Sequence, residues 1–78
     1  MYFKEAVSIR ILELCNEYNY SPNRLAEQSR IAPSTLNDLI NKNIENPSAL
    51  VIHKICKKLN IETMDFFDSD LFRVNFDD

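Results

Sequence analysis

Apolar side chains recur with the period of an α-helix along the first part of the chain. Between residues 4 and 18 they form one stripe at spacings of i, i+4, i+7, i+8 and i+11: Val7, Ile11, Leu14, Cys15 and Tyr18. Such a stripe is typical of a helix that buries one face and leaves the other in water. The pattern therefore predicts a helix over residues 4–18 with these side chains in the core.

A Ser-Pro pair marks the start of a second helix. The Ser21 hydroxyl can accept a backbone N–H as an N-cap, and Pro22 at the first helical position lacks only an N–H that would have no partner there. The short apolar pattern that follows predicts a helix over residues 22–29, with Leu25 and Ala26 facing inward.

Pro33 marks the start of a third helix in the same way, although the preceding Ala32 has no side-chain oxygen that could act as a cap. This helix is predicted over residues 33–42. It ends where Asn43 can take the left-handed backbone conformation that glycine usually supplies. Its predicted inward residues are Leu36, Leu39 and Ile40.

Two more helices are predicted in the second half of the chain. Ser48 is the expected N-cap of the fourth helix, which ends near Asn60 in the left-handed conformation. One face of this helix is apolar and consists of Ile52, Ile55, Cys56 and Leu59. A short fifth helix is predicted over residues 62–68 and buries some of Met64, Phe66 and Phe67.

Residues 72–76 alternate between apolar and polar side chains with a period of two, which is a β pattern. The apolar residues after the fifth helix are Leu71, Phe72, Val74 and Phe76. They either fold back on the first helix beside Tyr2 and Phe3, or pair as a short strand with a second chain. The acidic residues around them favour the second arrangement, because charges typically rim an apolar interface.

The length of 78 residues is enough for one domain. We expect residues 1–69 to form that domain and residues 70–78 to form a short acidic and aromatic tail. The predicted fold class is all-α, a five-helix bundle with a helix-turn-helix unit at its centre. The chain has no apolar run long enough to span a bilayer and no signal-peptide pattern at its start, so we expect a cytoplasmic protein without membrane contact.

The composition argues against an enzyme. With 0 Gly the chain cannot form a P-loop, a dinucleotide-binding fingerprint or a nucleophile elbow. Positions with positive φ must then be filled by other residues, and asparagines are the natural candidates. Cys15 and Cys56 are predicted to be buried free thiols, and His53 to be a surface imidazole. No metal, cofactor or small-molecule substrate is predicted.

The net charge of −3 is unevenly distributed. Residues 62–78 carry a charge of −5, whereas residues 1–61 carry +2. The acidic balance therefore belongs to the C-terminal end, and it leaves the rest of the chain mildly attractive to a nucleic acid.

Residues 21–42 combine two short helices with a tight turn, which is the spacing of a helix-turn-helix unit. Small Ala26 allows the helices to cross closely, and Ile31 fills their junction. With the apolar residues of the third helix inward, a polar stripe remains outward: Ser34, Asn37, Asp38 and Asn41. Such short side chains can hydrogen-bond base edges in the major groove. The alternative is the ordinary hydrated face of a bundle.

Several short motifs accompany this unit: Leu25-Ala26, Ile31, Ser34-Thr35-Leu36, Leu39, Asn46-Pro47-Ser48, Ile55-Cys56, Leu59-Asn60-Ile61 and Phe66-Phe67. Together they resemble the Xre-type helix-turn-helix family of phage repressors and Cro, over about residues 11–68. The resemblance implies a five-helix domain that binds duplex DNA at paired half-sites as a homodimer. The expected function is therefore sequence-specific DNA binding by a transcriptional regulator, and specifically a repressor.

Both the resemblance and the polar stripe point to a set of DNA-contacting residues. The predicted base-reading residues are Ser34, Thr35, Asn37, Asp38 and Asn41. The predicted phosphate-binding residues are Ser21, Asn23, Lys42, Asn43 and Ser48, which lie at helix ends. Each of these could instead be a helix cap or a hydrated charge. Lys54, Lys57 and Lys58 are interpreted as partners of the negative end of the fourth helix.

The sequence departs from the family pattern at three positions, Pro22, Arg30 and Pro33. Arg30 stands where the family usually has glycine, and Pro22 where many members have a glutamine that supports base reading. Pro33 cannot read a base edge, and Asp38 places a negative charge on the expected DNA face. With the acidic tail, Asp38 favours an alternative function: a dimerisation or antitoxin-like interaction module with weak DNA binding.

Overall fold

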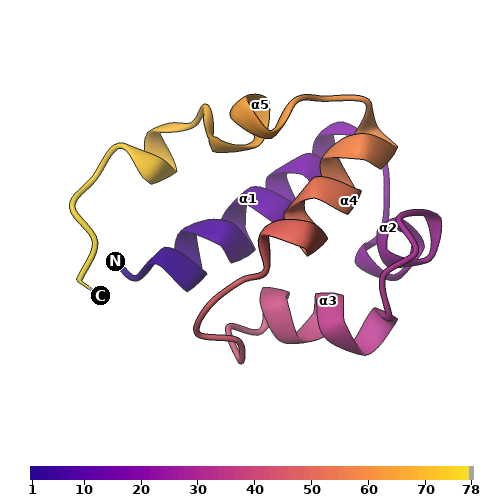
Figure 1. Ribbon diagram of the computed structural model, residues 1–78, viewed down its shortest axis with the longest axis horizontal. Helices are drawn as coiled ribbons and strands as arrows, with labels where there is room; N and C mark the ends of the chain where they lie inside the picture. The colour runs from indigo at the N-terminus through magenta and orange to yellow at the C-terminus, as the bar shows by residue number, and fades with distance from the viewer. Residues whose placement is uncertain (78) are drawn as a thin grey trace.

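The computed structural model describes residues 1–77. Within this range it contains five α-helices, one turn of 3-10 helix and no strand (Figure 1). The elements are α1 (Phe3–Glu17), α2 (Pro22–Gln28), α3 (Pro33–Ile40), α4 (Ala49–Leu59), α5 (Thr63–Phe67) and η1 (Asp70–Phe72). The predicted all-α, five-helix fold is confirmed. The β pattern at residues 72–76 was misleading, because that segment follows a helical turn and packs within the chain.

In Figure 1, α1 and α4 cross the middle of the molecule, with α5 along the top and α3 along the bottom. α3 packs against both α1 and α2, and α2 also contacts α4. The domain measures 32 × 23 × 20 Å. This arrangement leaves one side of α3 at the surface, far from α5.

The hydrophobic core combines side chains from all five helices. Its buried members are Val7, Ile11, Leu14, Cys15, Leu25, Ala26, Ile31, Leu36, Leu39, Ile52, Ile55, Cys56, Leu59 and Phe66. The predicted inward faces of the first four helices are confirmed, with Ile40 only half-buried, except at Tyr18, which is 38% exposed. The reason is that α1 ends at Glu17 and the chain leaves helical geometry at Tyr18, so that Tyr20 packs against the core instead.

The predicted helix starts are confirmed by their caps. Ser21 Oγ accepts a hydrogen bond from the Arg24 backbone N–H at 3.2 Å, and Pro22 is the first residue of α2. Ser48 Oγ accepts from the backbone N–H groups at the start of α4. α3 begins at Pro33 without a side-chain cap, as its sequence indicates.

Four helices end at a residue in the left-handed conformation although the chain has no glycine. These residues are Asn19 (φ 60°), Arg30 (φ 59°), Lys42 (φ 65°) and Asn60 (φ 59°). In each case the N–H of the next residue bonds a carbonyl five residues earlier, which satisfies groups at the helix end. The prediction that Asn43 would be left-handed is wrong, because α3 stops at Ile40 and the reversal falls at Lys42.

α5 is held against α1 by Arg10. Its Nε donates to the Phe66 carbonyl at 2.7 Å, and its Nη2 donates to the Asp65 carbonyl at 2.8 Å. The Phe66 ring is fully buried beneath this contact. A guanidinium that bonds two helical carbonyls at once fixes both position and orientation, because its donors are rigidly planar.

The C-terminal segment folds back on the start of α1. The Phe76 ring lies at 90° to the Phe3 ring, with centroids 5.5 Å apart, and Phe72 packs edge-on against Phe67 at 4.9 Å. The Asp77 backbone N–H also donates to the Met1 carbonyl at 3.2 Å. Of the two predicted arrangements, the fold-back is therefore the one in the structure. The last residue of the predicted 70–78 tail lies outside the described residues.

Candidate nucleic-acid interface

The surface of α3 has the polar stripe that its sequence predicts. Ser34, Asn37, Asp38 and Asn41 are all exposed, while Leu36 and Leu39 on the opposite side are buried. Thr35 lies between the two faces and is half-buried. Within residues 1–77 none of the four exposed side chains hydrogen-bonds another residue, so their donors and acceptors are available to an external ligand.

α3 is fixed at both ends. At its C-terminal end the buried Ser8 hydroxyl of α1 donates to the Ile40 carbonyl at 2.6 Å. At its N-terminal end Ile31 is buried in the core just before the helix begins. Ser8 was not among the predicted core residues, although its position next to Val7, on the side of the helix that carries the apolar stripe, indicated that it faces the core.

The turn before α3 depends on Arg30. Its φ of 59° places it in the left-handed region, and its N–H donates to the Glu27 carbonyl at 3.2 Å. The N–H of Ile31 donates to the Ala26 carbonyl at 2.9 Å. The turn thus has the shape that glycine usually forms, but with a long exposed cation at its tip.

The turn after α3 has the same construction. The Lys42 N–H donates to the Leu39 carbonyl at 3.2 Å, and the Asn43 N–H donates to the Asp38 carbonyl at 2.8 Å. Both Lys42 and Asn43 are exposed. The structure therefore places an exposed cation within three residues of each end of α3, namely Arg30 and Lys42.

The remaining predicted phosphate contacts lie at helix starts. Ser21, Asn23 and Ser48 are exposed. The oxygens of Ser21 and Ser48 already accept backbone N–H groups, so each hydroxyl has only its own proton to donate to a phosphate. Ser21 and Ser48 are therefore confirmed as helix caps. The binding of phosphate by Ser21, Asn23 and Ser48 stays a prediction.

The positive charges of the domain are paired at its ends and unpaired at its centre. Lys4 pairs with Glu45, Arg10 with Glu13, and Arg73 with two aspartates of the C-terminal segment. The cations without an ion pair among residues 1–77 all lie between residues 24 and 58: Arg24, Arg30, Lys42, Lys54, Lys57 and Lys58. The overall charge of −3 thus conceals a basic central region.

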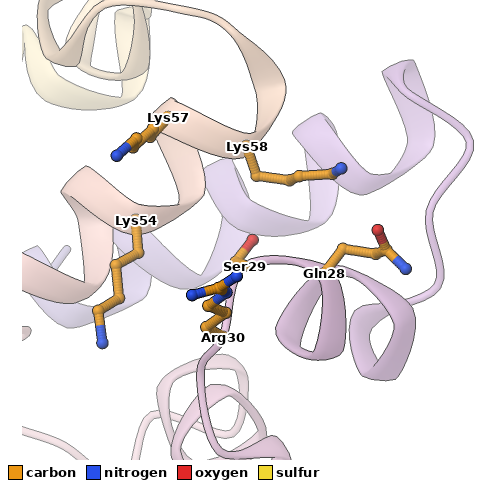
Figure 2. Close-up of a pocket in the computed structure, with 6 residues that line it drawn as sticks. All are labelled: Gln28, Ser29, Arg30, Lys54, Lys57 and Lys58. Carbon is orange, nitrogen blue, oxygen red and sulfur yellow. The ribbon is translucent and has the colours of Figure 1, made fainter.

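Four of these cations form a group that was not predicted from the sequence. Arg30 of the α2–α3 turn and the lysines of α4 line one pocket, together with Gln28 and Ser29 (Figure 2). The lysines at positions 54, 57 and 58 have the i, i+3, i+4 spacing of one helix face, which was the available signal.

Reactive thiols, an accessible histidine, a metal site or a membrane-spanning helix would each indicate a different function. Cys15 and Cys56 are free and buried, as predicted, and burial raises the pKa of both thiols. His53 is exposed on α4. Within residues 1–77 no group of three or more His, Cys, Asp or Glu side chains is placed to hold a metal ion. None of the described helices is long and apolar enough to cross a membrane.

The comparison with known families bears directly on α3. A family model described as the Cro/C1-type HTH DNA-binding domain matches residues 10–70, more than three quarters of the chain. The matched span contains α2, α3, α4 and α5 in full. No curated protein and no solved structure matches the chain.

Proposed function

Because the chain belongs to the Cro/C1-type helix-turn-helix DNA-binding family, we propose that it binds duplex DNA sequence-specifically and represses transcription. The observation that carries this proposal is the surface of α3, where exposed polar side chains without internal partners lie between two exposed cations. A helix of this kind fits the major groove, where side chains can reach base edges.

In this function the residues of α3 read bases. Asn37 has the amide that bonds adenine through two hydrogen bonds, and Ser34, Thr35 and Asn41 supply shorter donors and acceptors. Asp38 can accept from the amino group of cytosine. Pro33 contributes no donor, so the reading surface begins one residue into the helix.

The phosphate contacts come from the residues around α3. Lys42 and Asn43 leave the C-terminal end of the helix together, and they are the strongest candidates because both side chains are exposed. Ser21, Asn23 and Ser48 add contacts at the starts of α2 and α4. Contacts of this type position the protein on the duplex without reading its sequence.

We further propose that the protein acts as a homodimer on two half-sites about one turn of DNA apart. Because the aromatic rings of the C-terminal segment pack within the chain, we propose that the interface lies elsewhere. Ile9 and Leu12, one turn apart on α1, are exposed apolar side chains that a second copy could cover. Sedimentation with and without the selected duplex tests this, since a dimer has twice the mass of 9.1 kDa.

The test of DNA binding is selection of duplexes from a random pool, followed by binding measurements with variants. Asn37→Ala should cost about 1–3 kcal/mol at one base pair and change the preferred sequence there. Lys42→Ala should weaken binding to all sequences and lower the salt slope by about 1. Arg73→Gln removes the same charge from the C-terminal segment and is the matched control.

The role of Asp38 separates DNA reading from the alternative of an interaction module. If its carboxylate accepts from a base, Asp38→Asn loses preference at one position. If it only repels phosphates, the same substitution strengthens binding to every sequence. If no duplex is enriched and Asn37→Ala and Lys42→Ala bind DNA like the parent, α3 does not read DNA and the interaction module is the better description.

A further inference from the structure

A hollow of about 490 Å³ lies between the α2–α3 turn and the C-terminal half of α4. It is lined by Gln28, Ser29, Arg30, Lys54, Lys57 and Lys58, and we call it the basic pocket. Its volume lies within the range of small-molecule sites. None of the side chains proposed to read bases or phosphates lines it.

The basic pocket has an unbalanced positive charge. Four of its lining residues are cations, and none of them forms an ion pair within residues 1–77. No carboxylate is among the described lining residues. The C-terminal ends of α2 and α4 lie nearby and contribute roughly −0.5 charge each. The last carbonyls of both helices already accept backbone N–H groups. The four cationic side chains are therefore opposed by a total of only about one negative charge from the two helix ends.

Ser29 gives the pocket an unused hydrogen-bonding group. The residue is only 6% exposed, and its Oγ has no hydrogen-bond partner in the described structure. Buried hydroxyls almost always have a partner, because an unmade hydrogen bond is costly in the interior. Ser29 also lines the basic pocket, so its unused hydroxyl belongs to the residues that would surround a ligand there.

Stabilisation of α4 through its helix dipole explains the position of only some of the four cations in the basic pocket. Lys57 and Lys58 lie in the last turn of α4, where cations favour the helix dipole. Lys54 lies one turn earlier, and the dipole effect falls off within the last turn. Arg30 belongs to a different element and carries a strained backbone. A bound anion would be stabilised by all four.

We propose that the basic pocket binds a small anion with several phosphate groups. Figure 2 shows Ser29 and Arg30 on the turn that faces α4, with Lys54 and Lys57 on one side and Lys58 and Gln28 on the other. Because the lysines lie on both sides of Arg30 in this view, an anion with several phosphate groups matches their arrangement better than a single phosphate does. The ligand class is therefore a di- or triphosphate group. The pocket includes Arg30, one of the two cations that flank α3, but none of the side chains proposed to read bases.

The test uses the full chain and inorganic tripolyphosphate, titrated by calorimetry in about 0.1 M salt, where exposed charges are partly screened. Inorganic phosphate is titrated in parallel and should bind more weakly. Lys58→Gln should raise the dissociation constant about tenfold, as expected for a lost charge-assisted hydrogen bond. Arg24→Gln removes the same charge outside the pocket and should bind like the parent.

Ser29→Ala tests the hydroxyl separately. Because Ser29 Oγ has no partner in the fold, the substitution should leave the melting temperature unchanged or higher. It should nevertheless raise the tripolyphosphate dissociation constant at least about threefold, since a donor to the ligand is lost. Lys58 is exposed, so Lys58→Gln keeps the test valid if the buried substitution disturbs folding.

Three results would overturn the proposal. The first is no saturable binding of tripolyphosphate by the parent. The second is equal weakening by Arg24→Gln and Lys58→Gln, which would reflect net charge alone. The third is a Lys58→Gln variant that loses duplex affinity but binds tripolyphosphate like the parent, which would assign the lysines to the DNA backbone.

Discussion

Replacing Arg30 by glycine should make the protein more stable. Arg30 is left-handed at φ 59°, and its exposed side chain forms no hydrogen bond or ion pair within residues 1–77. The left-handed conformation costs a residue with a Cβ roughly 1–2 kcal/mol, and glycine avoids this cost. Glycine also gains freedom in the unfolded chain, which offsets about half of the benefit. The net gain is about 0.5–1 kcal/mol.

Thermal unfolding followed by circular dichroism measures this gain. For a domain of this size, 1 kcal/mol corresponds to about 4–8 °C, so Arg30→Gly should melt roughly 2–8 °C above the parent. Arg30→Ala is the matched control, because it removes the same side chain and charge but keeps the Cβ. It should melt close to the parent.

The difference in melting temperature between Arg30→Gly and Arg30→Ala tests whether the left-handed backbone at Arg30 is strained. An Arg30→Gly variant that melts no higher than Arg30→Ala would show that the left-handed turn carries no strain. Both variants remove one cation from the basic pocket, so both should weaken tripolyphosphate binding to a similar extent. Stability and anion affinity would then change in opposite directions only in the glycine variant.

Three further predictions follow from buried groups and from the C-terminal segment. Ser8→Ala leaves the Ile40 carbonyl without its partner and should cost about 1–3 kcal/mol in urea unfolding; a loss near zero would contradict the buried bond. Cys15 and Cys56 should react slowly with a thiol reagent until the protein unfolds. Because burial raises the pKa of both, stability should be full below the ordinary value of 9.0 and fall as pH rises above it, visible as a lower melting temperature. Removal of residues 70–78 should cost about 2 kcal/mol in urea unfolding, because it uncovers the half-buried rings of Phe3 and Phe67, and it should leave the oligomeric state in solution unchanged.

The helices and their inward faces could be predicted because their signals are local. Pro22 and Pro33 are the first residues of their helices, and Ser48 caps α4 through hydrogen bonds to neighbours in sequence. The buried stripes follow from the helical period alone. The end of α3 could not be placed this way. Asn43 was the predicted left-handed residue, but Lys42 takes that position because α3 itself ends at Ile40.

The arrangement of the C-terminal segment depends on long-range packing. Its alternating pattern is compatible both with a strand that pairs with a second chain and with a segment that folds back on α1. The fold-back becomes evident only from the contact of Phe76 with Phe3. The candidate DNA-reading face is different, since the inward position of Leu36 and Leu39 leaves the polar residues of α3 outward by elimination. The basic pocket joins residues 28–30 to α4. The spacing of the three lysines indicates one face of α4, but the position of Arg30 beside that face has no local signal in the sequence.

The left-handed residues on either side of α3 connect stability with function. Asparagine tolerates this conformation best after glycine, and Asn19 and Asn60 occupy the two left-handed positions away from α3. The two that flank α3 are Arg30 and Lys42, which tolerate it less well. Neither cation has an ion-pair partner within residues 1–77, so neither is placed there for a contact in the fold. A strained backbone with an unpaired cation near each end of the same helix supports the proposal that an anionic ligand binds there. Replacing Arg30 or Lys42 by glycine should therefore raise stability but lower the affinity for the anion or for DNA. Replacing Asn19 by glycine should leave both affinities unchanged.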